Sequence, residues 1–336
     1  MAKNNFDCIR LFAAIAIFFY HCIAYYSNAF VDVRFGLFNL FFIWTGKIAM
    51  FTFFFISGYL VTASYTKSKN IFIFLKKRWL RIYPAQIFAT VLMVFIFGPM
   101  LSTVSLTAYS SSWVTYKYLL YESLLITNTK QLPGVYSNKC INPSTWSLYL
   151  EVKLYIILGI LGSLGIFKYK KIVLSLFIVF TLVANLVSRA YLQSFTTINI
   201  SVWLDYGSYF ILGSICYLFK DYLKFKPYIL LLLLILYCSS YALHIATDLF
   251  ETYFYAYLIL YLAIGIKQTV QLNNDFSYGI FLWHAPVLIF MVNYLTSVNN
   301  LLLFILVAAC ITFAFAALSW YVVERRYKYK PQKLTT

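Results

Sequence analysis

The sequence predicts an all-α membrane protein, a polytopic bundle of about ten transmembrane helices with both termini in the cytoplasm. Hydrophobic residues make up 62% of the 336 positions and charged residues only 11%, whereas roughly a quarter of the residues in a soluble domain are charged. Apolar runs of about twenty residues recur along the chain, each long enough to cross about 30 Å of hydrocarbon as a helix. The alternating pattern of a membrane barrel is missing, so we expect helices to satisfy the backbone.

Each apolar run predicts one helix. The expected helices cover 9–27, 48–65, 82–101, 148–167, 171–189, 200–219, 228–246, 252–267, 276–295 and 301–322. The stretch 37–46 is also apolar, so the second helix either starts early or follows an interfacial segment. The first run is too long for the core of a signal peptide and precedes no clear cleavage site. The longest hydrophilic stretch is roughly 102–147, rich in Ser, Thr and Tyr, and we expect 1–336 to be one transmembrane domain with no soluble domain appended.

The basic residues predict the orientation. A net charge of +17 would suit nucleic acid, but these residues gather in short loops between apolar runs, a pattern typical of membrane topology. With the N-terminus inside, twenty Lys and Arg residues fall in cytoplasmic segments and five fall outside, namely Arg34, Lys117, Lys130, Lys139 and Arg189. An even number of spans then predicts two cytoplasmic termini, with membrane lipid and not nucleic acid as a partner.

Several familiar site signatures are absent from the sequence. The six cysteines follow neither a disulfide framework nor a metal spacing. The sequence also contains no Walker loop, no dinucleotide fingerprint, no pair of histidines four residues apart and no Gly-x-Ser-x-Gly elbow. We therefore expect no metal and no tightly bound cofactor.

Two histidines are expected near the middle of the bilayer. Eleven residues at about 100° each put Arg10 and His21 on one face of the first helix, with His21 about 16 Å beyond Arg10. Counting outward from Asp275 puts His284 at a similar depth, about 13 Å into the ninth helix. A titratable group at that depth is costly and indicates a functional site. The alternative is a neutral histidine that bonds to a neighbouring helix.

Glu151 lies at the outer mouth of the fourth helix. Carboxylates are scarce, since the chain has only ten Asp and Glu residues. Glu151 would orient an imidazole, bind sugar hydroxyl groups, or simply pair with Lys153 or Lys47. The residue alone does not separate these alternatives.

Arg78 and Arg81 lie at the cytoplasmic entry to the third helix. Residues three apart share one side of a helix, and two guanidinium groups together suit a diphosphate or a phosphomonoester. The alternative is that both residues only anchor the helix on the cytoplasmic side.

Six motifs in order along the whole chain resemble those of membrane acyltransferase family 3. They are Arg10 followed by His21 after ten intervening residues, the run 53–60 (FFFISGYL), the run 78–84 (RWLRIYP), Trp146-Ser147-Leu148 with Glu151, the run 278–284 (YGIFLWH) and the run 321–325 (YVVER). Members of this family O-acetylate surface polysaccharides and related glycans. The family often has proline after the last Glu-Arg, where this chain has Arg326, and the difference touches none of the expected catalytic residues.

The resemblance implies an O-acetyltransferase of a bacterial inner membrane. Acetyl-CoA would be the cytoplasmic donor, and a hydroxyl group of a lipid-linked or growing surface polysaccharide would be the acceptor at the outer face. The residues that it implies are His21 and Glu151 for catalysis, Arg10, Arg78 and Arg81 for the donor, and Trp146, Ser147 and His284 for the acceptor. His21 would act as a general base or carry the acetyl group as an acyl-imidazole.

Two other function classes fit part of the sequence. A transporter or flippase for a glycan or a polyanion would also need many helices and buried polar groups, although the halves of the chain lack the paired, broken helices typical of inverted repeats. A scaffold for a glycan assembly complex would need the chain but not His21 or Arg78. Hydrolysis of acetyl-CoA by the purified protein would separate an enzyme from both.

The predicted orientation can be checked by labelling. A cysteine at Ser111 should react with an impermeant thiol reagent in intact spheroplasts, because the hydrophilic stretch 102–147 is expected outside. A cysteine at Ser68 should react only after lysis. The opposite pattern would reverse the topology and exclude a cytoplasmic donor.

Overall fold

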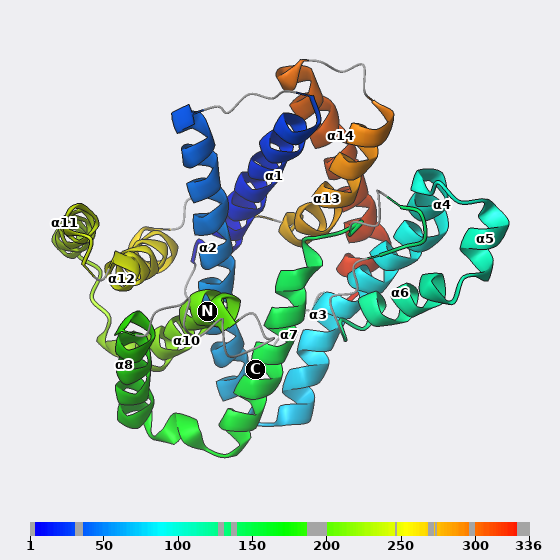
Figure 1. Ribbon diagram of the computed structural model, residues 1–336. Helices are drawn as coiled ribbons and strands as arrows, with labels where there is room; N and C mark the ends of the chain where they lie inside the picture. Colours follow the sequence, from blue (N-terminus) through cyan, green and yellow to red (C-terminus); the bar gives the residue numbers. More distant parts are fainter. Residues whose placement is uncertain are drawn as a thin grey trace. The chain divides into compact units, whose positions relative to one another are not determined.

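A computed structural model of the chain describes residues 4–30, 36–126, 131–135, 140–186, 200–245, 247–267, 272, 274–295 and 300–327. Their regular secondary structure is helical (Figure 1), apart from one isolated antiparallel bridge between Ser102 and Val135. The prediction of an all-α fold is therefore confirmed. Arg34, Lys130, Lys139 and Arg189, which the topology argument used, lie outside the described residues.

Each expected apolar run contains a helix. These helices are α1 (Phe6–Phe30), α2 (Gly36–Ser68), α3 (Ile71–Leu92), α7 (Thr145–Ser163), α8 (Lys170–Leu186), α10 (Ile200–Leu218), α11 (Pro227–Leu243), α12 (Thr247–Leu260), α13 (Ser277–Tyr294) and α14 (Leu301–Ser319). The shorter elements are α4 (Gly98–Leu101), α5 (Leu106–Ser111), α6 (Trp113–Ser123), α15 (Arg325–Tyr327), the 3-10 turns η3 (Ile166–Lys168) and η4 (Lys220–Tyr222), and the π-helical turns η1 (Met93–Phe97), η5 (Tyr261–Gly265) and η6 (Trp320–Glu324). The expected helix ends at 187–189 and 246 lie outside the described residues.

The helices identify the chain as a polytopic membrane protein. Within the described part of the chain, five helical segments are long and apolar enough to cross a membrane: Phe6–Ala29, Trp44–Ser68, Ile71–Leu101, Thr145–Ser163 and Leu301–Tyr327. Helix α11 is apolar too, but it has only 17 residues. A helix satisfies its backbone groups internally, which hydrocarbon requires because it offers no hydrogen-bond partners.

The third helix begins earlier than the sequence predicted. Helix α3 starts at Ile71 rather than at 82 because Asn70 caps its first turn, where the Asn70 side-chain oxygen accepts a hydrogen bond from the Ile73 amide at 3.0 Å. Arg78 and Arg81 therefore lie on the helix itself. The second helix also starts early, at Gly36, which is one of the two alternatives left open for the apolar stretch 37–46.

Helix α3 continues through the π-helical turn η1 into α4. The Gly98 amide donates to the Met93 carbonyl five residues back. In the same five-residue pattern, the Val94 carbonyl would accept from the amide of residue 99, but residue 99 is a proline and has no N–H. The Tyr109 hydroxyl on α5 donates to that carbonyl instead, at 2.8 Å. A Cβ at Gly98 would lie 2.0 Å from the Tyr109 hydroxyl oxygen, so only glycine leaves room for this bond.

The chain folds into two compact units. Unit 1 comprises Met1–Ala13, Lys47–Phe74 and Leu154–Asn273, and unit 2 comprises Ala14–Gly46, Leu75–Lys153 and Asn274–Thr336. In unit 1, α11 and α12 lie side by side, and in unit 2 α13 and α14 do so (Figure 1).

Aromatic side chains fill the core of unit 2. Trp283 on α13 is completely buried. Its ring stacks on Phe315 of α14 with centroids 4.8 Å apart, and Phe97 lies 6.2 Å away. These contacts tie α13 to α14 and to the π-helical turn of α3, and thereby fix the helix that carries His284.

In unit 1, α2 and α10 approach each other at two glycines. A Cβ at Gly58 would lie 1.9 Å from the Phe210 carbonyl oxygen, and one at Gly213 would lie 2.1 Å from the Phe55 carbonyl oxygen. The Ser214 hydroxyl also donates to the Gly58 carbonyl at 3.3 Å. Small residues of this kind let membrane helices pack backbone to backbone.

We expect Gly58→Ala to separate α2 from α10, because the methyl group would meet a backbone carbonyl that cannot turn aside. The cost should be at least about 2 kcal/mol, with a melting temperature in detergent several degrees below that of the wild type. Gly207→Ala on α10 is the matched control, since a Cβ there meets no atom within 4 Å. Equal melting temperatures for the two variants would show that the close approach is not required.

Candidate functional site

Two histidine rings meet in unit 2. His21 Nδ1 on α1 and His284 Nε2 on α13 are 3.0 Å apart, and the ring centroids are 4.8 Å apart. His284 is completely buried, whereas His21 is partly exposed. The structure thus brings together the two histidines that the sequence placed at similar depths on different helices.

Backbone carbonyls assign the tautomers of the pair. His21 Nδ1 lies 3.1 Å from the Ile17 carbonyl oxygen, and His284 Nδ1 lies 3.2 Å from the Ile280 carbonyl oxygen. A carbonyl only accepts, so each Nδ1 carries a proton when the rings are neutral. The single Nδ1 proton of His21 is then shared between the Ile17 carbonyl and His284 Nε2, and His21 Nε2 keeps a lone pair.

Ser144 is a further member of the site that the sequence did not indicate. Its hydroxyl oxygen lies 3.3 Å from His284 Nε2, and its carbonyl accepts a hydrogen bond from the Ser147 hydroxyl at 3.1 Å. Ser147 was expected to contact the acceptor, so the structure links this residue to His284 through Ser144. Both serines are buried.

Asn142 holds the segment before α7 against α13. Its side-chain amide donates to the Leu282 carbonyl at 3.0 Å, and its side-chain oxygen accepts from the Ser144 amide at 3.3 Å. The Thr145 hydroxyl donates to the Asn142 carbonyl at 2.9 Å. The sequence 142–145 (NPST) is rich in residues that begin helices, and this was the available signal for a structured turn.

A glycine lets the first two helices approach near His21. A Cβ at Gly46 on α2 would lie 2.8 Å from the ring of Tyr20, the residue before His21. The Tyr20 and His21 rings are 4.9 Å apart. The close fit of Tyr20 against Gly46 fixes the part of α1 that carries His21.

Three motifs from distant parts of the chain converge at the other end of unit 2. The Tyr278 hydroxyl donates to the Ile82 carbonyl at 3.0 Å, and the Glu324 carboxyl group accepts from the Ser319 hydroxyl at 2.8 Å. Arg81 lies close enough to Glu324 to attract its carboxylate. Arg81 therefore has a structural partner as well as its expected role with the donor.

The remaining predicted residues lie apart along the chain. In unit 1, Arg10 is buried and its guanidinium group pairs with Asp7, one turn earlier on α1. Arg78 lies one turn before Arg81 on α3. Trp146 and Glu151 are partly exposed on α7.

Lys47 and Lys153, the suggested partners of Glu151, have other contacts. Both carboxyl oxygens of Glu251 accept from Lys47 Nζ, at 3.1 and 3.0 Å. Lys153 Nζ bonds to the Tyr149 hydroxyl and lies 3.8 Å from the centre of that ring. Sequence reasoning missed Glu251, which lies 204 positions from Lys47.

A second polar cluster in unit 2 surrounds Glu122 on α6, another residue that the sequence did not single out. Glu122 is 1% exposed, and its backbone carbonyl accepts from the Gln86 side chain at 3.0 Å. Within the part of the chain that the structure describes, a Glu122 carboxyl oxygen, the Gln86 amide oxygen and the Tyr118 hydroxyl have no hydrogen-bond partner. Burial raises the pKa of Glu122 to about 7, and a hydrogen bond with Thr145 opposes part of the rise.

Comparisons with known proteins agree with the motifs. The model of an acyltransferase domain family matches residues 3–323. An O-acetyl transferase of Shigella phage Sf6 is 27% identical over 336 residues, 97% of this chain and 97% of that protein. Nodulation protein 10 of Rhizobium leguminosarum bv. viciae is 42% identical over 83 residues, which cover 25% of this chain and 22% of that protein. The chain matches no solved structure.

Glu122 should make the stability of the protein depend on pH. Between its ordinary pKa of 4.5 and about 7, the unfolded chain ionises Glu122 while the folded chain keeps it protonated, so stability falls as pH rises through this window. The whole loss is roughly 3 kcal/mol. In detergent, the wild type should melt at a lower temperature at pH 8 than at pH 5, and Glu122→Gln should show a smaller difference.

The control for this comparison is Asp221→Asn, which removes an exposed carboxylate in η4 and should follow the wild type. If Glu122→Gln keeps the full difference between the two pH values, ionisation of Glu122 is not its cause.

Proposed function

The chain belongs to this acyltransferase family, and we propose that it transfers an acetyl group from cytoplasmic acetyl-CoA to a hydroxyl group of a cell-surface glycan or of its lipid-linked precursor. The observation that carries the proposal is the hydrogen bond between His21 and His284. The similarity to a phage O-acetyl transferase along nearly the whole chain supports an acetyl group and an oxygen acceptor.

We place the protein in a bacterial inner membrane with ten spans and both termini in the cytoplasm. The bias of Lys and Arg toward one set of loops supports this topology. It puts Arg78 and Arg81 on the cytoplasmic side and α5 and α6 outside. The donor then enters from the cytoplasm, and the acceptor reaches His21 from the outer face.

In this mechanism His21 is the general base. The lone pair on Nε2 takes the proton of the acceptor hydroxyl while the hydroxyl oxygen attacks the thioester carbon of acetyl-CoA. The carbon–sulfur bond then breaks, and the CoA thiolate recovers the proton from the His21 imidazolium. The products are the O-acetylated glycan and free CoA.

His284 has a positioning role in this proposal, rather than the acceptor contact that the resemblance implied. Its Nε2 accepts from the His21 Nδ1 proton, so it holds the tautomer in which His21 Nε2 is basic. The bond gains charge assistance when His21 becomes an imidazolium. An aspartate serves the same purpose in the triad of serine hydrolases, and here a neutral imidazole supported by Ser144 replaces it.

A second branch of the mechanism uses the same atom. His21 Nε2 attacks the thioester first and becomes an acetyl-imidazole, CoA leaves, and the acceptor hydroxyl then takes the acetyl group. The free lone pair on Nε2 supports both branches. A trapped acetyl group on His21 would distinguish the second one.

The other predicted residues keep their roles as proposals. Arg10, Arg78 and Arg81 bind the phosphates of the donor, which need fixed cationic partners where they leave water. Trp146, Ser147 and Glu151 contact the acceptor at the start of α7. Family membership makes the chain an acyltransferase, so a flippase or a scaffold does not account for it.

Substitutions at the histidines test the mechanism. We expect His21→Ala to lower glycan acetylation by roughly two to four orders of magnitude while membrane abundance stays near that of the wild type. His284→Leu removes the acceptor for His21 Nδ1 and should cost roughly ten- to a hundredfold. His284→Gln should recover part of that loss, because its amide oxygen can accept the same hydrogen bond. Acetylation is measured by NMR of the surface glycan.

The third histidine provides the control. His244 is exposed, with a φ of 55° that asparagine tolerates, so His244→Asn should match the wild type. Activity above a tenth of the wild-type level in His21→Ala would make His21 a packing residue.

A further inference from the structure

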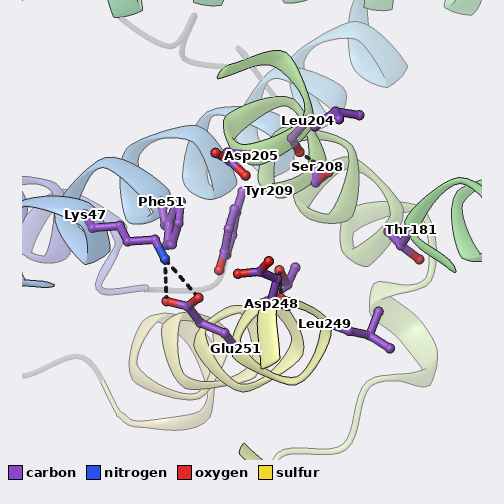
Figure 2. A pocket seen from close by; sticks show the side chains of 11 residues that line it. Lys47, Phe51, Thr181, Leu204, Asp205, Ser208, Tyr209, Asp248, Leu249 and Glu251 are labelled. Atoms are coloured by element: carbon purple, nitrogen blue, oxygen red, sulfur yellow. Dashed lines mark hydrogen bonds and ion pairs between the residues drawn. The ribbon is translucent and has the colours of Figure 1, made fainter. Parts of the chain in front are cut away.

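A polar pocket lies in unit 1, whereas the histidine pair lies in unit 2. Its lining comes from α2, α8, α10 and α12, and Figure 2 shows it from close by. The charged and hydroxyl groups that matter for its chemistry are Lys47, Asp205, Tyr209, Asp248, Glu251 and Thr252. The volume open inside it is about 40 Å³, which holds a few water molecules or a few sugar hydroxyl groups.

The lining of this pocket has an excess of negative charge. Lys47 forms a two-pronged ion pair with Glu251, which is 3% exposed. Asp205 and Asp248 line the same space, so three carboxylates face one ammonium group. This balance disfavours phosphate or any other anion.

One wall of the pocket has a buried hydroxyl group whose hydrogen bonding is incomplete within the described residues. Tyr209 is 2% exposed, and within the described residues its hydroxyl oxygen makes no hydrogen bond of normal geometry, although the Thr252 side chain lies near enough to interact with it. In Figure 2 the hydroxyl end of its ring points toward Asp248 and Glu251. Leaving such a group unsatisfied costs free energy, and a polar ligand in the pocket would remove that cost.

The same wall is aromatic. The rings of Tyr209 and Phe51 stack with centroids 4.0 Å apart and an angle of 16° between their planes. A sugar residue offers apolar C–H groups on its ring faces and hydroxyl groups around its edge. Aromatic rings next to carboxylates and hydroxyls match both kinds of surface, whereas an acyl chain would leave the charged groups without water.

Resting on the proposed function, we propose that this pocket binds the hydroxyl-bearing edge of one neutral sugar residue of the acceptor glycan. The carboxylates accept from the sugar hydroxyls, and Tyr209 exchanges a hydrogen bond with one of them. Sugars that carry a carboxylate are rejected by the net negative charge. In the proposed topology Asp205 and Glu251 lie near the outer ends of α10 and α12, the side from which the acceptor comes.

Binding to matched sugars tests the proposal without any acetyl transfer. The probes are methyl glycosides of glucose, galactose, mannose and rhamnose, together with the uronates of the first three, measured by saturation-transfer NMR on the full chain in detergent. At least one neutral glycoside should bind, and its uronate counterpart, where one exists, should not. Tyr209→Phe should weaken binding about three- to tenfold, since it removes one hydrogen bond.

A second pair of variants addresses charge. Asp205→Asn combined with Asp248→Asn keeps the shape of the pocket but removes two negative charges, and it should allow a uronate to bind. A purely structural role for these residues would not change the selectivity between a sugar and its uronate. Tyr241→Phe on α11, outside the lining of the pocket, is the control and should bind like the wild type.

The outcomes separate the two proposals. If the wild type binds none of the neutral glycosides, or binds them equally well after Tyr209→Phe, this pocket is not an acceptor site. If sugar binding depends on Tyr209 but the protein does not acetylate any glycan, the proposal of a sugar-binding pocket stands and the proposed reaction is wrong.

Discussion

In the proposed mechanism, the hydrogen bond from His21 Nδ1 to His284 Nε2 is the interaction on which the chemistry depends. Two imidazoles can share it only if one donates and the other accepts, and the carbonyls of Ile17 and Ile280 favour His21 as the donor and His284 as the acceptor. Neither histidine has a carboxylate among these contacts. The pair therefore needs no fixed charge in the apolar interior, where an isolated charge is costly.

The surroundings of the pair serve to hold that geometry. Asn142 fastens the start of α7 to α13, and Ser144 adds a second contact to His284. Trp283 sits beside His284 in an aromatic core that fixes α13. The two histidines are thus held in place by neighbours that have no part in the proposed reaction, which is the usual way in which a site keeps its precision.

Much of the fold followed from the sequence, and less of the site did. Apolar runs predicted the helices because hydrocarbon imposes their length, while the start of α3 was misjudged because its first turns are basic and capped by Asn70. Matching depths indicated His21 and His284. The contact of Ser144 with His284 spans 140 positions, and that of Lys47 with Glu251 spans 204. Local periodicity in the sequence cannot predict these contacts, because they arise only when distant segments pack together.

The π-helical turn η1, which continues α3, determines the direction in which the side chains after it point from the helix axis. A π turn holds one residue more than an α-helical turn, so side chains beyond η1 are rotated by about 100° from where a regular helix would put them. Loss of one residue from that turn would restore the regular pitch and swing Gly98 away from Tyr109. The hydrogen bond from the Tyr109 hydroxyl to the Val94 carbonyl would then be lost. Insertions or deletions in this short stretch would therefore change the packing of α5 and α6.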